Sequence, residues 1–494
     1  MKKKTSFLIS AALALAVAAA LAGCGSTTYF AGRKLPPSGL TNRVLIAIQN
    51  PNPLTKGQLQ FVDAYYDIRS GYTDSPATFS ITGYTGALPI TIQNMPEEQL
   101  GGVYGFGDGT FDLVSYATEK INGMVGGLIG LSSSVYITRN QAYVFAASQS
   151  ANAFTVVNQA GGGAYPLSLP GVYRVSTNPG GSMALAFVQN SNYAYYPLQL
   201  TSTQTISYSG GTSTWPKAAV DCEPQSAPKW CLFQAQSPDN IDATGNYYGA
   251  PLTFDRPYKA VFSADGGTAY ILSCGPECGG SVASVTPLPI APMIFFLGQT
   301  SGLLPTTSAL ASSTIPVPGG ASNALVASTT LYVVGQRYFP SSGLFGGNLT
   351  VLDLSKSPVA VSSPIPISDG APGARSRILL ADDNTLWIGM SKCTNGVRAN
   401  LPAQYPSGYG CLTMLNVSNP TSPSVTLLEP YLGDATGIAA VTGLHKIYTA
   451  IGGQVYIYST VDGSSIDNQY VTVTGVASDV AYMDGISDSN NTVY

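Results

Sequence analysis

Short segments in which apolar and polar residues alternate recur along most of the chain, separated by turns rich in Gly, Asn and Asp. The clearest copy covers residues 260–273, where an apolar segment meets the turn Asp265-Gly-Gly and a second apolar segment follows. Similar copies lie at 324–334, 378–388 and 438–448, with others at 135–144 and 172–185. Third segments follow at 348–353, 412–416 and 454–458. A period of two predicts half-buried β-strands joined by hairpin turns.

The copies are spaced regularly. Each second segment carries an aromatic residue: Tyr143, Tyr270, Tyr332, Trp387 or Tyr448. The last three intervals are each about 60 residues, which is the size of a repeat made of short strands. Such a repeat predicts an all-β β-propeller in which every unit is one four-stranded blade. We expect the aromatic side chains to pack between blades.

Seven blades are expected. Six begin near residues 125, 171, 256, 320, 375 and 437, and the seventh needs both ends of the chain. Ser478–Met483 would supply its first strand, and Arg43–Ile48 and Gln58–Asp63 its second and third. This pairing would close the ring and leave no unpaired edge. Regions near 93–123, 201–255, 287–312 and 394–410 are interpreted as loop insertions, and two smaller sheet domains remain an alternative.

The repeat resembles the YVTN-repeat and lactonase-like group of seven-bladed propellers. The similarity is clearest at Phe262–Gly266, Leu331–Val334 and Leu349–Asp353, and it extends over most of residues 125–483. This resemblance implies a catalytic His, Arg and Glu on the face of the central channel. The chain has a single His, His445, in a predicted turn, so we expect a solvated turn residue there.

The N-terminus carries a secretion signal. Three lysines follow Met1, and an apolar run from Phe7 to Leu21 ends in Leu21-Ala-Gly-Cys24. Its short apolar core and small closing residues predict a cleaved signal peptide over 1–23. The ending resembles the bacterial lipoprotein box, which implies a lipid on Cys24. An ordinary signal peptide with an incidental Cys is the alternative.

The lipoprotein resemblance also bears on location. Residues 24–42 are expected to be an anchor and flexible tether, and 43–494 the propeller. Gly25 stands where an Asp, in that family, favours retention in the inner membrane. The resemblance therefore implies the outer membrane, on its periplasmic face or at the cell surface.

Composition narrows the function further. Charged residues make up 10% of the chain, the net charge is −4, and the basic residues form no cluster in sequence, which disfavours nucleic acid as a partner.

Six cysteines remain after Cys24 and form three local pairs in sequence: Cys222 and Cys231, Cys274 and Cys278, and Cys393 and Cys411. Fifteen pairings are possible in principle. Neighbour pairing by disulfides is the expectation in an oxidising compartment.

A metal or redox site at Cys274 and Cys278 is the alternative interpretation of that pair. With one His in the chain, a Cys/His zinc site lacks nitrogen ligands, and no metal or cofactor is expected.

Aligning the repeats on their turns places Lys259, Asn323, Arg377, Gly437 and Asp479 at the mouth of the central channel. They would either bind a small polar ligand or a peptide, or simply solvate the mouth.

No catalytic set is assembled in the sequence. The sequence therefore favours a monomeric, lipid-anchored, non-catalytic binding or scaffold protein for envelope proteins or small polar ligands. A lactonase-like hydrolase acting on a sugar lactone is the alternative. A quinone-dependent dehydrogenase is disfavoured, because the chain lacks a Trp-rich blade motif.

Overall fold

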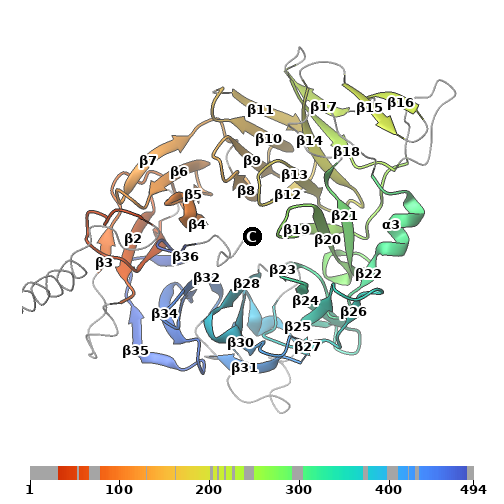
Figure 1. Ribbon diagram of the computed structural model, residues 1–494. Coiled ribbons are helices and arrows are strands. Elements are labelled where there is room, and N and C mark those ends of the chain that lie inside the picture. The colour runs from red at the N-terminus through yellow and green to blue at the C-terminus, as the bar shows by residue number, and fades with distance from the viewer. Residues whose placement is uncertain are drawn as a thin grey trace, which may run out of the picture.

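Eight sheets of four or five strands are arranged as blades around one axis in the computed structural model (Figure 1). The structure describes residues 32–486, except 53–54, 66–77, 130, 162, 201–203, 209–210, 216–218, 225–228, 238–249, 292–303, 371–375, 398–409, 421 and 429–432. The predicted signal peptide and Cys24 lie outside these residues. Within them the protein is an all-β propeller, as predicted, and forms one ring rather than two sheet domains.

Blades 1 to 4 contain the first half of the chain and the closing strand; their strands are given from the innermost outwards. Blade 1 consists of β36 (Val476–Tyr482), β1 (Arg43–Gln49), β2 (Gln58–Asp63) and β3 (Thr78–Ser80). Blade 2 consists of β4 (Pro89–Met95), β5 (Leu100–Gly105), β6 (Thr110–Ser115) and β7 (Lys120–Val125). Blade 3 consists of β8 (Ser134–Ile137), β9 (Tyr143–Ser148), β10 (Ala153–Asn158) and β11 (Gly163–Ser168). Blade 4 consists of β12 (Val172–Thr177), β13 (Ala184–Val188), β14 (Ala194–Leu200), β18 (Lys229–Gln234) and β17 (Ala219–Glu223).

Blades 5 to 8 follow in chain order. Blade 5 consists of β19 (Pro257–Phe262), β20 (Thr268–Cys274), β21 (Ala283–Pro289) and β22 (Ile315–Pro316). Blade 6 consists of β23 (Asn323–Ala327), β24 (Thr330–Phe339), β25 (Leu344–Asp353) and, both paired with β25, β26 (Ala360–Val361) and β27 (Ile365–Pro366). Blade 7 consists of β28 (Ser376–Ala381), β29 (Thr385–Met390), β30 (Leu412–Asn416) and β31 (Ser424–Leu428). Blade 8 consists of β32 (Ala435–Val441), β33 (Lys446–Ile451), β34 (Gln454–Ser459) and β35 (Ser465–Val471).

The helical segments are short connections. They are η1 (Pro96–Glu98), η2 (Gly275–Cys278), α3 (Thr307–Ser313), η4 (Asp382–Asn384) and η5 (Cys393–Asn395). None of the helices in the described part of the chain is long and apolar enough to cross a membrane.

The expected number of seven blades is wrong, because the region interpreted as an insertion near 93–123 forms most of blade 2. Its second strand, β5, reads Leu-Gly-Gly-Val-Tyr-Gly and lacks the repeated aromatic residue at its third position. A Cβ added to Gly102 at that position would lie 2.5 Å from the Phe111 ring. Phe111 belongs to the next strand, β6, so the third strand supplies the bulk that the second strand supplies elsewhere.

The ring closes as predicted. The C-terminal strand β36 pairs antiparallel with β1, and Val44 lies opposite Tyr482. β1 continues the sheet into β2 and β3, so both ends of the described chain contribute to blade 1. Joining the first and last strands removes the free edges that an open sheet would present.

Two of the expected insertions lie partly outside the basic blade pattern, although 201–255 also contains β18, which is the fourth strand of blade 4. Residues 201–255 include a separate hairpin of β15 (Gln204–Tyr208) and β16 (Gly211–Trp215), and also β17, which adds a fifth, outer strand to blade 4. The described part of 287–312 includes most of α3, whose first turn is capped by the Thr306 hydroxyl accepting from the Ala309 amide. Figure 1 shows both at the outer side of the ring.

The repeated aromatic residues pack where the sequence predicted. Tyr143, Tyr332, Trp387 and Tyr448 are buried in the hydrophobic clusters of the core, and Tyr270 packs partly buried against one of them. Large aromatic side chains bury more area per residue than any others, so they contribute strongly to adhesion between blades.

The two faces of the ring are distinguished by the direction of the innermost strands. We call the side on which the innermost strands begin the start face, and the side on which they end the end face. Because neighbouring strands are antiparallel, connections between the second and third strands of a blade also lie on the start face. These connections include η2, the β24–β25 hairpin and η5.

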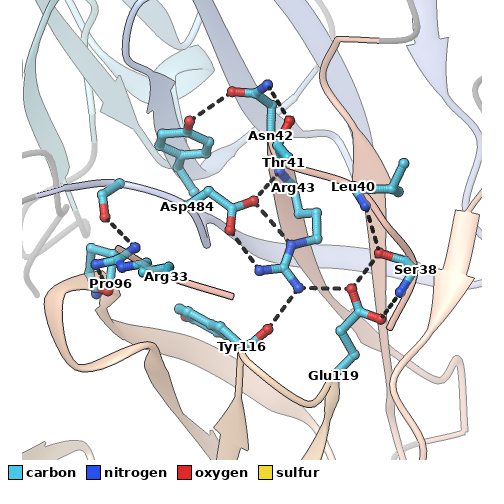
Figure 2. Close-up of polar contacts among 12 residues, drawn as sticks. Arg33, Ser38, Leu40, Thr41, Asn42, Arg43, Pro96, Tyr116, Glu119 and Asp484 are labelled. Atoms are coloured by element: carbon cyan, nitrogen blue, oxygen red, sulfur yellow. Dashed lines mark hydrogen bonds and ion pairs between the residues drawn. The ribbon is translucent and has the colours of Figure 1, made fainter. Parts of the chain in front are cut away.

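A buried polar cluster on the end face holds the closing blade to blade 2 (Figure 2). The guanidinium of Arg43 donates through Nε and Nη2 to the two carboxylate oxygens of Asp484, at 3.0 and 2.6 Å. Its Nη1 donates to the Tyr116 carbonyl at 2.7 Å and to Glu119 at 2.8 Å. One arginine therefore connects β1, the residues after β36 and the β6–β7 turn.

The described part of the predicted tether lies against this cluster. Arg33 donates to the carbonyls of Gly485, at 3.0 Å, and Pro96, at 2.5 Å. Ser38 donates to the Glu119 carboxylate through both its amide and its hydroxyl. Residues 33–43 are thus held on the end face of the propeller.

Candidate functional site

The innermost strands of five blades share a local irregularity near their start. In β4, β12, β19, β32 and β36 the pairing with the next strand skips one residue: Ile90, Tyr173, Tyr258, Thr436 or Ser478. A β-bulge of this kind redirects the side chain that follows it. The residues after the skipped positions are Thr91, Arg174, Lys259, Gly437 and Asp479. Three of the five predicted mouth residues therefore occupy structurally equivalent positions, and Asn323 and Arg377 lie near the starts of β23 and β28.

Lys259 and Asn323 are brought together. The Lys259 ammonium donates to Asn323 Oδ1 at 2.8 Å, across the boundary between blades 5 and 6. Lys259 is only 4% exposed. Burial lowers the pKa of Lys259 well below its usual value, and the positive charges of Arg174 and Arg377 lower it further. Each arginine is therefore close enough to Lys259 to act on its charge.

Arg377 and Asp479 are also brought together. Arg377 Nη2 lies 3.4 Å from Asp479 Oδ2, and Arg377 Nε donates to the Thr436 carbonyl at 2.7 Å. Asp479 in turn accepts from the amides of Ile92 and Val480, at 2.8 and 3.0 Å. Burial raises the pKa of Asp479, and the Arg377 charge opposes that change. The pair links blades 7, 8, 1 and 2.

Gly437 contributes space instead of a contact. A Cβ at this position would lie 2.5 Å from Asp479 Oδ1 and 2.7 Å from the Val480 nitrogen. Both distances are shorter than real Cβ contacts, so a larger residue here would displace Asp479.

Arg174 belongs to the same group and was missed in the sequence. It follows the bulge of β12, its guanidinium carbon lies 4.5 Å above the centre of the Tyr258 ring, and its Nη2 donates to the Tyr258 hydroxyl. The arginine is half-buried, unlike Lys259 and Arg377. The repeat over 172–185 contains it, but that weaker copy was not among the repeats aligned on their turns. Thr91 was missed because blade 2 was interpreted as an insertion.

The mouth residues do more than solvate the mouth, because Lys259, Asn323, Arg377 and Asp479 are all buried and bonded across blades. Arg377 and Asp479 are each 1% exposed. This geometry suits electrostatic cohesion of the ring. It does not place either side chain where a bulky substrate can touch it.

His445 lies apart from this group. It occupies the β32–β33 turn on the end face, with positive φ, as a turn residue. Its Nδ1 lies 2.8 Å from Asp383 Oδ2, and this hydrogen bond raises the pKa of the exposed imidazole. Among the described residues, no three His, Cys, Asp or Glu side chains gather closely enough to hold a metal ion.

The six cysteines form the three neighbour disulfides that were predicted: Cys222–Cys231, Cys274–Cys278 and Cys393–Cys411. The first joins residues directly opposite each other in β17 and β18. The other two close connections on the start face, in blades 5 and 7. The redox or metal interpretation of Cys274 and Cys278 is therefore not needed to explain their proximity.

Between those two disulfides the β24–β25 hairpin projects from the start face. Its strands are ten residues each, longer than any other strand in the described part of the chain. We call η2, the hairpin tip Gln336–Phe345 and residues 391–397 the rim. Exposed Arg337 and Tyr338 lie at the tip, where the Tyr338 and Phe345 rings pack in a tilted arrangement with centroids 5.1 Å apart.

The rim is braced from both sides. Glu277 of η2 accepts from the Gln336 amide at 3.0 Å, and the Val397 amide donates to the Phe345 carbonyl at 2.8 Å. Buried Asp369 accepts from the Gly347 amide at 3.0 Å, below the tip. The hairpin is therefore fixed to blades 5 and 7 and does not stand alone.

Comparisons with known proteins do not assign this chain to a family. No protein-family model and no curated protein matches the chain. Similar solved structures include the periplasmic gluconolactonase PpgL of Pseudomonas aeruginosa, at 11% identity and a TM-score of 0.46, covering 89% of this chain and 98% of that one. Hydrazine synthase of Kuenenia stuttgartiensis is 13% identical with a TM-score of 0.45, covering 78% of this chain and 99% of that one. A putative 6-phosphogluconolactonase of Bacteroides uniformis is 11% identical with a TM-score of 0.42, covering 89% and 99%.

Proposed function

We propose that this chain is a non-catalytic scaffold of the bacterial cell envelope, exported and anchored in the outer membrane by lipid on Cys24, which binds a protein partner through the rim. The observation that carries the proposal is the projecting β24–β25 hairpin, braced at Glu277 and Val397 and presenting Arg337 and Tyr338.

The composition of the hairpin tip suits a protein partner. Tyr338 is 40% exposed although its ring is apolar, and Arg337 lies with its guanidinium carbon 5.4 Å from the centre of the Phe339 ring. Aromatic residues and arginine are enriched at the energetically dominant centres of protein interfaces. Bracing fixes the hairpin before binding, which lowers the entropy that association has to overcome.

The test is affinity capture of the intact protein from detergent-solubilised native envelope, with mass spectrometry of co-purifying proteins. A double variant, Arg337→Ala with Tyr338→Ala, is compared with Val461→Ala. Val461 is a matched control because it is 66% exposed and lies in the β34–β35 turn on the end face. We expect a partner that the wild type and Val461→Ala recover and the double variant loses. Equal recovery by all three proteins would remove the rim from the proposal.

The proposed anchor is tested separately, because Cys24→Ser removes the only site for the lipid. We expect wild-type protein in the outer-membrane fraction and the Cys24→Ser protein in the soluble periplasm. Membrane association that survives the substitution would contradict lipid anchoring through Cys24.

The lactonase alternative requires chemistry at the centre of the ring. Arg377 and Asp479 are the residues to test, and both are buried and bonded across blades. Turnover of a sugar lactone that disappears in Arg377→Ala and Asp479→Ala, while the variants remain folded, would replace the scaffold proposal by a hydrolase.

A further inference from the structure

The blade 5 brace of the rim is built inside a disulfide loop. Cys274 and Cys278, four positions apart, are bonded to each other, and η2 spans the loop that they close. Glu277, the residue before Cys278, accepts from the Gln336 amide at 3.0 Å. The side chain that holds the hairpin therefore belongs to a loop whose covalent closure is a disulfide.

The blade 7 brace also contains a disulfide, and that one is buried. Cys393–Cys411 closes the connection that contains Val397, whose amide donates to the Phe345 carbonyl at 2.8 Å. Both cysteines are only 3% exposed. Thiol–disulfide exchange requires a thiolate to reach one of the two sulfurs, so this burial protects the blade 7 brace.

The disulfide of the blade 5 brace can be approached from one side. Cys274 is fully buried, whereas Cys278 is partly exposed. Pro276 and Gly279, on either side of Cys278 in sequence, are exposed. A Cβ added to Gly279 would meet no described atom within 4 Å, so the space beside Cys278 is open. The two braces of the hairpin therefore differ in their access to a thiol.

Closure of the loop also limits the conformations open to Glu277. Gly275 and Gly279 have φ values of 62° and 77°, in the left-handed region that glycine enters at little cost. Once the disulfide is open, backbone hydrogen bonds such as Gly280 to Gly275, at 2.8 Å, hold the loop without a covalent link. Glu277 is 6% exposed in the closed loop, and relaxation of η2 would bring water to its carboxylate.

We propose that the Cys274–Cys278 disulfide is a thiol-exchange site for a dithiol protein, and that its reduction frees the hairpin tip from the blade 5 brace. A thiolate of the dithiol attacks Cys278 Sγ, and the Cys274 sulfur leaves and takes up a proton. The second thiol of the reductant then displaces Cys278 as a thiol. The propeller disulfide gains two electrons and two protons, and the dithiol is oxidised to a disulfide. Any effect on a partner rests on the proposed function of the rim, whereas the exchange site does not.

The remaining disulfide provides the matched control. Cys222 is partly exposed and Cys231 is buried, as in the blade 5 pair. Their disulfide joins β17 to β18 in blade 4, which contributes nothing to the rim. Its removal should therefore leave the bracing of the hairpin unchanged.

The test uses dithiothreitol as the dithiol probe on the mature protein without denaturant. Newly formed thiols are alkylated and located by peptide mass spectrometry, and hydrogen exchange is followed over the tip, residues 336–345. The wild type is compared with a blade 5 variant, Cys274→Ser with Cys278→Ser, and a blade 4 variant, Cys222→Ser with Cys231→Ser. Dithiothreitol is also added to the blade 4 variant, in which the other partly exposed disulfide is absent.

We expect Cys274 and Cys278 to be alkylated at a dithiothreitol concentration that leaves Cys393 and Cys411 unlabelled. The Gln336 amide should then exchange about tenfold or more faster, as expected when a hydrogen bond to a charged acceptor is lost. The blade 5 variant should show this fast exchange without reductant, and the untreated blade 4 variant should exchange like the wild type.

Two results would overturn the proposal. One is a Cys274–Cys278 disulfide that resists dithiothreitol as long as Cys393–Cys411 does. The other is unchanged exchange at Gln336 once the blade 5 disulfide is reduced, a measurement that the treated blade 4 variant supplies even if the blade 5 variant does not fold. Neither measurement uses a captured partner, so failure of the rim as a partner-binding surface would leave both results unaffected.

Discussion

Arg377 contacts Asp479 across blade 8, which has a glycine, Gly437, packed against Asp479. The two residues come from blades 7 and 1, yet Arg377 Nη2 lies 3.4 Å from Asp479 Oδ2. Blade 8 lies between these blades in the ring and contributes Gly437 at the equivalent position, together with the Thr436 carbonyl that Arg377 Nε binds. The ion pair therefore depends on a glycine in a third blade.

Gly437→Ala tests this dependence. A Cβ 2.7 Å from the Val480 nitrogen forces the backbone of β36 to move, and overpacking of this kind costs about 1–3 kcal/mol. We expect that loss in the free energy of unfolding from denaturant titration. Gly126→Ala is the control, because a Cβ there meets nothing within 4 Å. An equal, small effect of both substitutions would show that β36 accommodates the methyl group.

Lys259→Met is expected to leave stability unchanged or increase it by up to about 2 kcal/mol at neutral pH, because it removes a charge from a buried position. Asn323 Oδ1 still accepts from the Ala324 amide at 2.9 Å. The measurement is denaturant unfolding at several pH values between neutral and 10.

The pH dependence of the wild type has a definite sign. The pKa of Lys259 is lower in the folded protein than in the unfolded chain. Between those two values the unfolded chain binds one more proton at this site, so stability rises with pH across that window. Lys259→Met should show a flatter profile there, and an unchanged slope would contradict the assignment.

Removing a carboxylate from the buried end-face cluster should lower the free energy of unfolding far more than removing one from a surface ion pair. Asp484→Ala removes the carboxylate that holds Arg43 in a buried position, and breaking such pairs costs about 3–5 kcal/mol. Glu97→Ala removes one partner of Arg139, where both side chains are about one third exposed, and should cost less than about 1 kcal/mol. Chemical unfolding of both variants measures the difference, and comparable losses would refute the closing role of Arg43.

The imidazole of His445 can be titrated by NMR without ambiguity in assigning its signals, because it is the only His in the chain. Its hydrogen bond with Asp383 raises the pKa of His445 above 6.5, while the Thr460 hydroxyl, and then His445, lower the pKa of Asp383 below 3.8. Proton NMR of the imidazole should show the raised value, and Asp383→Asn should return it toward 6.5. Asp353→Asn, in blade 6, should leave it unchanged.

The pKa shifts of His445 and Asp383 also determine how this pair affects stability at different pH values. The contribution of His445 is fully present below pH 6.5 and is lost as pH rises through its raised pKa. The contribution of Asp383 is present above pH 3.8 and is lost as pH falls through its lowered pKa. Contact between blades 7 and 8 at this point should therefore be strongest in mildly acidic solution.

The repeat pattern identified the propeller because strand alternation and turn chemistry are local properties of the sequence. It missed blade 2 because Gly102 leaves a space that Phe111, from another strand, fills. Whether a side chain from one strand fills a space in another depends on three-dimensional packing, so it produces no repeat in the sequence. The pairing of β36 with β1 was predictable, since an incomplete blade at each end implies closure.

Part of the candidate site was also predictable, because it depends on repeats that are visible locally in the sequence. Lys259 and Asp479 were found because their repeats align on the turn, and both occupy the position after a bulge. Arg174 occupies the same position in β12, and it was missed because the weaker repeat over 172–185 was not aligned with the others. The pairing of Arg377 with Asp479 depends on ring closure, which places residues 377 and 479 together irrespective of their separation in sequence.

The docking of Arg33 on the end face sets how the molecule would sit on a membrane. With the proposed lipid on Cys24, only nine chain steps separate the lipid from Arg33, a span of at most about 30 Å. The contacts of Arg33 with Gly485 and Pro96 therefore orient the ring, with its end face toward the bilayer. The hairpin tip then points away from the lipid surface, and partners would approach from the aqueous side.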